Sequence, residues 1–231
     1  MYAKFFKRMI DFTLSLLALV VLSPVLLTIS IISAIVLKGN PFFVQPRPGK
    51  KGKDGQEKIF NLIKFRTMSN ECNAEGEFLP DEKRLGAYGK FLRSTSLDEL
   101  PELINILLGE MSIIGPRPQL VRDMVFMTEE QRRRHDVTPG LTGLAQVNGR
   151  NCITWEDKFR YDLTYIDSGI TLWGDLKILI KTVLVVLDRR DTVREGTVSD
   201  LDFGDWLMEQ GKVQQEEYNE KQQEAKELLG V

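Results

Sequence analysis

The longest hydrophobic stretch of the chain lies near its N-terminus, where residues 12–37 include no charged side chain. These 26 residues would form a helix of about 39 Å, longer than the roughly 30 Å hydrocarbon core of a bilayer. Ser23 and Pro24 interrupt the stretch near its middle. Pro24 removes one backbone hydrogen bond, and the Ser23 hydroxyl can donate to the carbonyl left without a partner. The pattern predicts either a tilted membrane span or a helix broken into two arms.

Basic residues flank this stretch at both ends. Lys4, Lys7 and Arg8 precede it, and Lys38, Arg47, Lys50, Lys51 and Lys53 follow it. An excess of lysine and arginine is typical of the cytoplasmic side of a membrane segment. A single crossing would move one cluster to the far side, whereas a re-entrant helix broken at Ser23-Pro24 would keep both on one face. We expect residues 1–38 to form a membrane anchor, and the pattern alone leaves its topology open.

Shorter hydrophobic patterns predict a small, mostly helical α+β domain after the anchor. A loop rich in glycine and proline comes first, followed by a strand-like segment in which Lys64 and Arg66 share one face. Leucine and isoleucine then recur at helical spacing, which predicts a helix over residues 98–108. The stretch TPGLTGLAQVNGR predicts a short strand, with residues 148–150 as the tip of a β-hairpin.

The C-terminal third of the chain predicts two further kinds of helix. In TLWGDLKILIKTVLVVLDRR, an amphipathic pattern with Trp173, Lys177 and Lys181 is typical of a helix at a lipid interface, with a core helix as the alternative. The chain is acidic after this and ends in a polar helical pattern, which predicts an appended helix or a partner contact, such as a homodimer, rather than part of the site. The expected organisation is an anchor at 1–38, a domain at 39–190 and an acidic extension at 191–231.

The N-terminal part of the chain is basic and the remainder is acidic. The net charge of −2 combines +8 for residues 1–70, which carry 11 basic and 3 acidic side chains, with −10 for the rest. The basic part adjoins the anchor, so anionic lipid explains it, and nucleic acid is not expected because the positive charge does not continue. Two cysteines and one histidine give no disulfide framework and exclude most zinc sites.

The stretch RSTSLDELPELIN places two carboxylates, Asp98 and Glu99, where a helix starts. Pro101 has no N–H and fits only the first turn, so the helix must begin close to Asp98. Aspartate is a preferred N-cap residue, and carboxylates are favoured at the positive end of the helix dipole. On this motif alone, capping is the simplest interpretation.

Cations at constrained positions favour a functional interpretation. Arg93 precedes the two carboxylates, Arg117 lies between two prolines in GPRP, and Arg150 ends the turn NGR. Lys64 and Arg66 add two more charges. Such groups suit phosphate oxygens, which arginine can bind through two parallel hydrogen bonds. A helix N-terminus adds its own donors, so the combination predicts a polyphosphate site.

Six motifs together resemble those of the bacterial sugar transferase family, the monotopic phosphoglycosyl transferases. They are KRMIDFTLSLLALVVLSP, FFVQPRPGKKGK, KFRTM, RSTSLDELPELINILLGEMSIIGPRP, TPGLTGLAQVNGR and YDLTYID. They cover residues 4–188 with family-like order and spacing. Pro46 departs from the family pattern, and the tail after Asp188 lies outside it.

The resemblance implies transfer of a phosphosugar from a UDP-sugar to undecaprenyl phosphate, giving undecaprenyl-diphosphate-sugar and UMP. This reaction is the first membrane step of glycoconjugate assembly. The resemblance also implies magnesium at the site and a re-entrant anchor broken at Ser23-Pro24, on the cytoplasmic face of the bacterial inner membrane. It favours the hairpin over the membrane span.

By the same resemblance, Asp98 is the nucleophile that forms an aspartyl-phosphosugar in a ping-pong mechanism. Glu99 is the second member of the dyad, as metal ligand or proton acceptor, and the two carboxylates together would hold Mg²⁺. Lys64, Arg93, Arg117 and Arg150 fall on family positions that contact phosphate or nucleotide, and Asp162 falls on a polar position near the site.

Two other functions fit the residues. A membrane-attached scaffold would hold anionic lipid head groups without turnover, and its Asp98-Glu99 pair would only cap a helix. An inverting glycosyl transferase with a polyprenyl acceptor would release UDP instead of UMP. The sequence does not identify the sugar, and the short architecture suggests an N-acetylated hexosamine or a bacillosamine-type sugar.

Overall fold

A computed structural model describes residues 1–149, 153–188 and 201–230. Helices dominate, and the strands form one hairpin and one short parallel pair, as expected for an α+β domain. The α-helices are α1 (Lys7–Val36), α2 (Asp81–Arg84), α3 (Ala87–Ser94), α4 (Glu102–Leu108), α5 (Val121–Met124), α6 (Glu129–Arg132), α7 (Trp155–Asp167), α8 (Leu172–Asp188), α9 (Phe203–Glu209) and α10 (Gln215–Leu229). The strands are β1 (Phe42–Lys51), β2 (Glu57–Phe65), β3 (Ser112–Ile114) and β4 (Gly140–Thr142). A π-helical turn, η1 (Tyr2–Phe6), precedes α1, and the 3-10 turns are η2 (Leu97–Glu99), η3 (Arg133–Asp136) and η4 (Gln146–Asn148).

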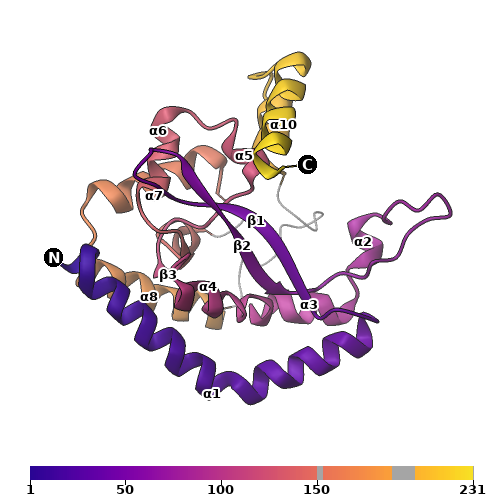
Figure 1. The fold of residues 1–231 in the computed structure, drawn as a ribbon, viewed down its shortest axis with the longest axis horizontal. Helices are drawn as coiled ribbons and strands as arrows, with labels where there is room; N and C mark the ends of the chain where they lie inside the picture. The colour runs from indigo at the N-terminus through magenta and orange to yellow at the C-terminus, as the bar shows by residue number, and fades with distance from the viewer. Residues whose placement is uncertain (150–152, 189–200, 231) are drawn as a thin grey trace.

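Helix α1 is bent, with two arms that rise from a low point near its middle (Figure 1). The backbone stays helical through Pro24, so the expected break is a bend within a continuous helix. Ser23 Oγ donates to the carbonyl of Val20 at 2.8 Å, the group that Pro24 leaves without its usual donor. The predicted compensation by Ser23 is confirmed. Together with η1, this helix is long and apolar enough to cross a membrane.

The polarity of α1 is the reverse of that of an ordinary surface helix. Four of its five buried residues are polar, namely Lys7, Asp11, Ser15 and Ser33, and the fifth is Ile29. Its exposed face carries Leu17, Val20, Val21, Leu27, Ile31 and Ile35, each more than half exposed. An exposed apolar face of this size requires an apolar environment, so α1 is a membrane-associated helix.

Both ends of α1 contact the same domain. At the N-terminal end, Lys7 Nζ forms a buried ion pair with Asp175 Oδ2 of α8 at 2.6 Å. At the C-terminal end, Arg66 Nη2 donates to the carbonyl of Leu37 at 2.8 Å. Because a cation at this carbonyl complements the helix dipole, Arg66 stabilises the end of α1.

The hairpin β1–β2 crosses above α4 and differs from the sequence-based expectation. Residues 42–51 were expected to be a loop, but they pair with β2 in antiparallel register, with Phe42 opposite Phe65 and Lys51 opposite Glu57. Pro46 and Pro48 lie within β1. Proline is tolerated in β1 because this strand has only one neighbour and needs no N–H on its open edge.

The hairpin expected with its tip at residues 148–150 is not found within the described residues. Strand β4 confirms the short strand predicted in this region, but it pairs in parallel with β3. The 3-10 turn η4 follows it. Arg150, at the expected hairpin tip, lies outside the described residues.

The core lies between the hairpin and the helices below it. Phe60 and Leu62 of β2 pack against Leu103 and Ile106 of α4, and α1 covers this cluster through residues such as Leu22. Removal of this apolar surface from water stabilises the contact, which holds the hairpin and the anchor to α4. The start of α4 is thereby fixed relative to both.

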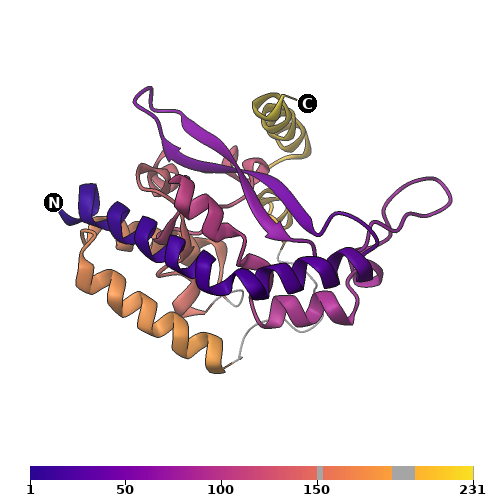
Figure 2. The ribbon, with the colours of Figure 1, turned by 60° about the horizontal axis from the view of Figure 1, so that its bottom comes forward.

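Helix α8 combines the two alternatives considered for it. Ile178 is buried against Ile114 and Tyr165, whereas Trp173 and Leu184 are 72% and 60% exposed. Helices α1, α3 and α8 line one side of the molecule, opposite α10 (Figures 1 and 2). This side therefore carries the exposed apolar faces of α1 and α8.

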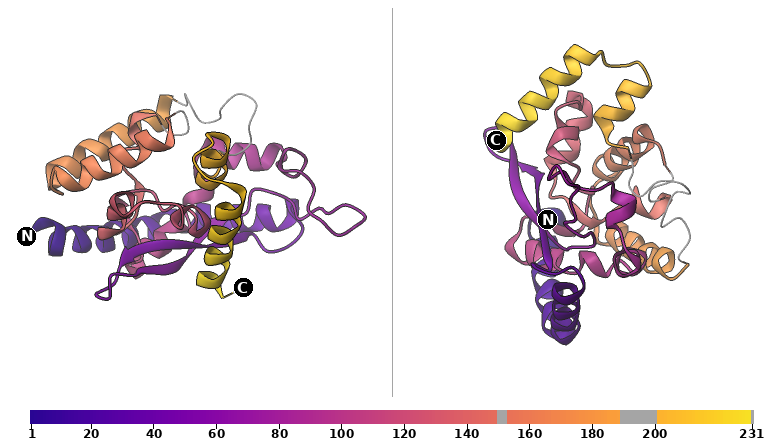
Figure 3. Two further views of the ribbon diagram at one scale, coloured as in Figure 1. Left: turned by 90° about the horizontal axis from the view of Figure 1, so that it is seen from above. Right: turned by 90° about the vertical axis from the view of Figure 1, so that its right-hand side faces the viewer.

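The C-terminal extension packs onto the domain. The ring of Phe203 in α9 lies 5.1 Å from that of Trp155 and 5.0 Å from that of Phe159, between ring centroids. Ala225 of α10 is buried against Val121 of α5. Figure 3 shows both helices folded back against the rest of the chain.

Candidate active site

The two carboxylates of the Asp98-Glu99 pair lie in a tight turn before helix α4. The predicted helix over residues 98–108 is divided into η2 and α4, with Pro101 as the N-cap residue of α4. Ser96, just before η2, has a left-handed backbone with φ 55°. This turn presents Asp98 and Glu99 at the head of α4, where the helix dipole is positive.

Asp98 does not cap the helix. Neither η2 nor α4 has a side-chain cap hydrogen bond, and no hydrogen bond or ion pair of the Asp98 carboxylate occurs within the described parts of the chain. The capping interpretation of the motif is therefore wrong for this residue. A partly buried carboxylate without a partner needs another explanation, because leaving it unpaired costs stability.

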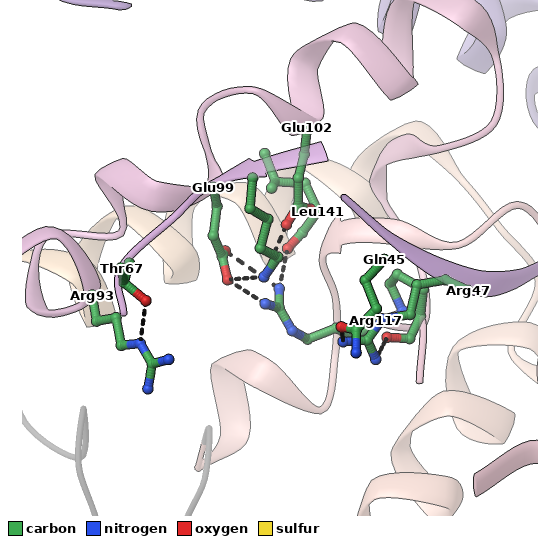
Figure 4. A network of polar contacts seen from close by, with 10 residues as sticks. Gln45, Arg47, Thr67, Arg93, Glu99, Glu102, Arg117 and Leu141 are labelled. Atoms are coloured by element: carbon green, nitrogen blue, oxygen red, sulfur yellow. Dashed lines mark hydrogen bonds and ion pairs between the residues drawn. The ribbon is translucent and has the colours of Figure 1, made fainter. Parts of the chain in front are cut away.

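Glu99, in contrast, is held by cations from two other elements (Figure 4). Arg117 binds it with two nitrogens, through Nη2 to Oε1 and through Nη1 to Oε2 at 3.3 Å. Lys64 Nζ of β2 lies 3.1 Å from Glu99 Oε1. The sequence predicted these residues as a group, and the structure brings Lys64, Glu99 and Arg117 together.

A third carboxylate, Glu102, was missed by the sequence reasoning. It is 1% exposed, and its Oε1 lies 3.1 Å from the same Lys64 Nζ that contacts Glu99. Its other carboxylate oxygen, Oε2, has no hydrogen-bond partner within the described residues. In the sequence, Glu102 resembles an ordinary acidic residue in a first helical turn, so only the packing of β2 onto α4 reveals it.

The pKa values of the neighbouring carboxyls shift in opposite directions. Burial and the negative charge of Glu99 raise the pKa of Asp98 to about 6, against the opposing effect of Lys64, Arg117 and Arg93. For Glu99, burial also favours the neutral form, but the charges of Arg117 and Lys64 outweigh it and lower the pKa to about 2. Near neutral pH, Glu99 is a fixed anion, whereas Asp98 is a carboxylate that is easily protonated.

Arg93 lies on the Asp98 side of the site. Its Nε donates to Thr67 Oγ1 at 3.1 Å, and burial lowers its pKa although the charge of Asp98 opposes this (Figure 4). Arg93, Asp98 and Arg117 all line one cavity of about 1600 Å³. The cavity extends to apolar side chains on α8, among them Val185 and Val186.

Arg47 is a further cation that sequence reasoning did not assign to the site. It donates to the carbonyl of Pro118 at 3.3 Å and to Gln45 Oε1 at 2.7 Å (Figure 4). Burial and the nearby charge of Arg117 lower its pKa to about 10. A signal was present, because Arg47 lies between two prolines, just as Arg117 does.

Two other predicted residues reach the cavity but are bound to protein groups. Arg66 lines the wall while it holds the carbonyl at the end of α1. Asp162 of α7 pairs with Arg134 at 2.7 Å, and both side chains are 2% exposed. Arg134 also donates to the carbonyl of Arg117 at 2.7 Å, so Asp162 supports the backbone that carries Arg117.

The carboxylates allow a specific test for magnesium. No cluster of three or more metal-binding side chains occurs within the described residues. Magnesium needs only one or two carboxylates when substrate phosphates supply further oxygens. Within the described residues, the Asp98 carboxylate has no ion pair and could bind the cation, whereas the Glu99 carboxylate is already bound by Arg117 and Lys64. The residues fit a cation that binds beside Asp98 together with a diphosphate.

A cation-lined cavity beside a membrane-associated helix defines a membrane-attached protein with a site for anionic ligands. The chain matches the family described as Bacterial sugar transferase over residues 2–189. This match covers most of the chain, and the protein belongs to that family.

Its relatives differ in length. The chain is 46% identical over 183 residues to the uncharacterized sugar transferase EpsL of Bacillus subtilis, covering 78% of this chain and 87% of that relative. It is 40% identical over 188 residues to a UDP-glucose:undecaprenyl-phosphate glucose-1-phosphate transferase of Klebsiella pneumoniae, covering 77% of this chain and 39% of the relative. It is 35% identical over 207 residues to an undecaprenyl-phosphate galactose phosphotransferase of Salmonella typhimurium, covering 82% and 42%. The chain spans about two fifths of the length of the last two.

Proposed function

We propose that the protein transfers a sugar 1-phosphate from a UDP-sugar to undecaprenyl phosphate, giving undecaprenyl-diphosphate-sugar and UMP. The observation that carries the proposal is the Asp98 carboxylate, which has no ion pair within the described residues and lines a cavity together with Arg93 and Arg117. The names of the Klebsiella and Salmonella relatives support the same substrates. A scaffold that binds only anionic lipid head groups would not need the Asp98 carboxylate among its cations, because this carboxylate would repel the head groups.

The first step is attack by an Asp98 carboxylate oxygen on the β-phosphorus of the UDP-sugar. A bond forms between that oxygen and phosphorus, the phosphorus–oxygen bond to UMP breaks, and UMP leaves with the electron pair. In the second step an oxygen of undecaprenyl phosphate attacks the same phosphorus and displaces the Asp98 carboxylate. Dividing the transfer in this way avoids bringing two mutually repelling anionic substrates together.

The cations around Asp98 have separate roles in this scheme. Arg117 and Lys64, fixed by Glu99, stabilise negative charge that develops on the transferred phosphoryl group. Arg93 binds phosphate on the Asp98 side. Magnesium at Asp98 would supply further neutralisation of the diphosphate when bound. Glu99 acts as the anion that orients the cations, because Arg117 and Lys64 hold it ionised.

The cavity shape supports a lipid acceptor. It runs from the charged residues around Asp98 to the apolar side chains Val185 and Val186 on α8. Phe91 of α3 also lines it and is 55% exposed. A polyprenyl chain in the bilayer would reach Asp98 along this apolar side, and its phosphate would meet Arg93.

We further propose that the anchor is re-entrant, so that the protein is monotopic on the cytoplasmic face of the bacterial inner membrane. The contacts at both ends of α1 support this, since Lys7 pairs with Asp175 and Leu37 is bound by Arg66. A spanning helix would separate these two ends by the whole bilayer and would break one contact.

Topology is measured with single cysteines placed at Lys4 and at Lys50, in a background without Cys72 and Cys152. We expect a membrane-impermeant thiol reagent to label both positions only from the cytoplasmic side. A cysteine introduced at a site already known to face the periplasm, in a control membrane protein, verifies that the membranes are sealed. Labelling at position 4 from outside would refute the re-entrant anchor.

The reaction is tested with purified protein, magnesium, undecaprenyl phosphate and a panel of UDP-sugars that includes glucose, galactose and the N-acetylated hexosamines. We expect UMP to be released with at least one sugar nucleotide. Release of UDP would instead indicate a glycosyl transferase, and no turnover with any sugar would favour the scaffold. Omission of magnesium tests the metal, with loss of activity expected.

A further inference from the structure

A second, smaller pocket adjoins the catalytic cavity. It has a volume of about 180 Å³ and shares Lys64, Arg117 and Lys158 with the larger cavity. Its other walls come from the hairpin, α4, the segment before α5, the start of α7 and the C-terminal extension. This volume is below the roughly 300–1,000 Å³ of pockets for drug-sized ligands, and it suits one monosaccharide better than a nucleotide.

The C-terminal extension closes this pocket. Leu201 and Asp202, directly before α9, form part of its wall. Their position is fixed, because Trp155 Nε1 donates to the carbonyl of Leu201 at 3.1 Å and Asp202 pairs with Arg122. Next along the chain, the N–H of Phe203 donates to buried Asp123 at 2.8 Å. The family match ends at residue 189, so this wall lies beyond the part shared with the family.

The pocket presents both acceptors and donors. Its Glu102 is 1% exposed; Oε1 lies 3.1 Å from Lys64 Nζ, and Oε2 has no hydrogen bond within the described residues. Asp202, which pairs with Arg122, supplies another carboxylate to the lining, and Arg47 and Lys158 supply cations. A hexose carries hydroxyl groups that donate and accept at the same time, so it can satisfy carboxylates and cations together.

The position of the pocket fits the sugar and not the lipid. Its lining includes no residue of α1, α3 or α8, which carry the apolar face of the molecule. It adjoins Lys64 and Arg117, the cations that would hold the diphosphate. The sugar is bonded directly to the β-phosphate of the donor, so it must lie next to these cations.

We propose that this pocket binds the hexose of the UDP-sugar and that the C-terminal extension, through Asp202 and Leu201, determines which neutral hexose is accepted. The inference rests on the proposed function and assigns the extension a place in the donor site. It replaces the sequence-based expectation that the tail lies apart from the site.

The test compares Asp202→Asn with the wild-type enzyme on UDP-glucose, UDP-galactose, UDP-N-acetylglucosamine and UDP-N-acetylgalactosamine, each with undecaprenyl phosphate. The loss of one charged hydrogen-bond acceptor should change the ratio of kcat/KM between the best hexose and its epimer by roughly tenfold. The inhibition constant of UMP should stay unchanged, because UMP carries no hexose.

Asp205→Asn is the matched control. Asp205 lies near the same Arg122, at 3.6 Å, and accepts a hydrogen bond from Tyr218, but it does not line the pocket. It should keep the wild-type order of sugars. Thermal unfolding of both variants verifies that the extension stays folded. Leu201→Phe provides a second variant, which should discriminate against N-acetylated sugars by filling the pocket.

The outcomes separate the two proposals. If the wild-type protein releases no UMP from any donor, the proposed function fails. If it releases UMP but both pocket variants retain the wild-type sugar ratios, the function stands and this inference is wrong. A rise in the UMP inhibition constant equal to the change for the sugar would place the nucleotide in the pocket and would also overturn the inference.

Discussion

Asp98 and Glu99 are neighbours in the chain, but their carboxylates have different partners in the site. On the Glu99 side, Arg117 and Lys64 saturate the carboxylate and lower its pKa to about 2. On the Asp98 side the carboxylate has no partner within the described residues, and burial raises its pKa to about 6. The difference supports the proposal that Glu99 orients the cations and that Asp98 reacts.

A pair of carboxylates with separated pKa values is a common way for a site to divide roles. In the proposed mechanism, the nucleophile is the carboxylate that no cation of the described residues pairs with, and the orienting anion is the carboxylate that stays ionised at the working pH. Asp98 fits the first role, and Glu99 fits the second.

The largest effect is expected for Asp98→Asn, which removes the nucleophile. Turnover should fall by on the order of 10³-fold or more, because the amide cannot form the covalent intermediate. The fold should be retained, since the Asp98 side chain caps neither η2 nor α4 and pairs with no side chain of the described residues. UMP release and thermal unfolding measure the two effects. Near-normal turnover of this variant would show that Asp98 is not the nucleophile.

Glu99→Gln tests the other half of the comparison. Turnover should fall by roughly 10²-fold without being abolished, because the amide oxygen still accepts a hydrogen bond from Arg117 but no longer neutralises it. The covalent intermediate should still form, only more slowly. If this variant were as inactive as Asp98→Asn and formed no intermediate, Glu99 would itself take part in the chemistry.

Arg117→Lys separates geometry from charge. Arg117 binds Glu99 with two nitrogens of its planar group, which lysine cannot reproduce. We expect a loss of kcat/KM of roughly 10- to 100-fold, close to that of Arg117→Ala. Full activity of the lysine variant would reduce Arg117 to a generic positive charge.

The pH dependence is the smallest effect and the one most specific to the pKa difference. Asp98 attacks as a carboxylate, so kcat/KM for the UDP-sugar should fall about tenfold per unit as the pH drops below about 6. Glu99 stays ionised throughout this range. A constant rate down to pH 5, with the protein still folded, would show that Asp98 has an ordinary pKa or is not the nucleophile.

The parts that the sequence predicted are those with strong local constraints. Pro101 confined the helix start to the neighbourhood of Asp98, and GPRP pointed to Arg117. Ser23 and Pro24 predicted the bend and its compensating hydrogen bond. In each case the constraint acts within a few residues, so the chain could be interpreted without tertiary packing.

The parts that it missed depend on contacts between distant segments. Pro46 and Pro48 suggested a loop, because nothing local shows that β1 pairs on only one edge. Glu102 looked like an ordinary first-turn acid until β2 placed Lys64 beside it. The extension looked wholly polar, yet the few apolar residues around Phe203 suffice to attach it to Trp155.

Covalent reaction of Asp98 can be detected by trapping the intermediate. The protein is incubated with magnesium and a sugar-labelled UDP-sugar, without undecaprenyl phosphate, and then digested and examined by mass spectrometry. We expect one equivalent of UMP and a phosphosugar adduct on the peptide that contains Asp98, absent from Asp98→Asn and retained in Glu99→Gln. If UMP appears only when both substrates are present and no adduct forms on that peptide, Asp98 forms no covalent intermediate and the proposed mechanism is wrong.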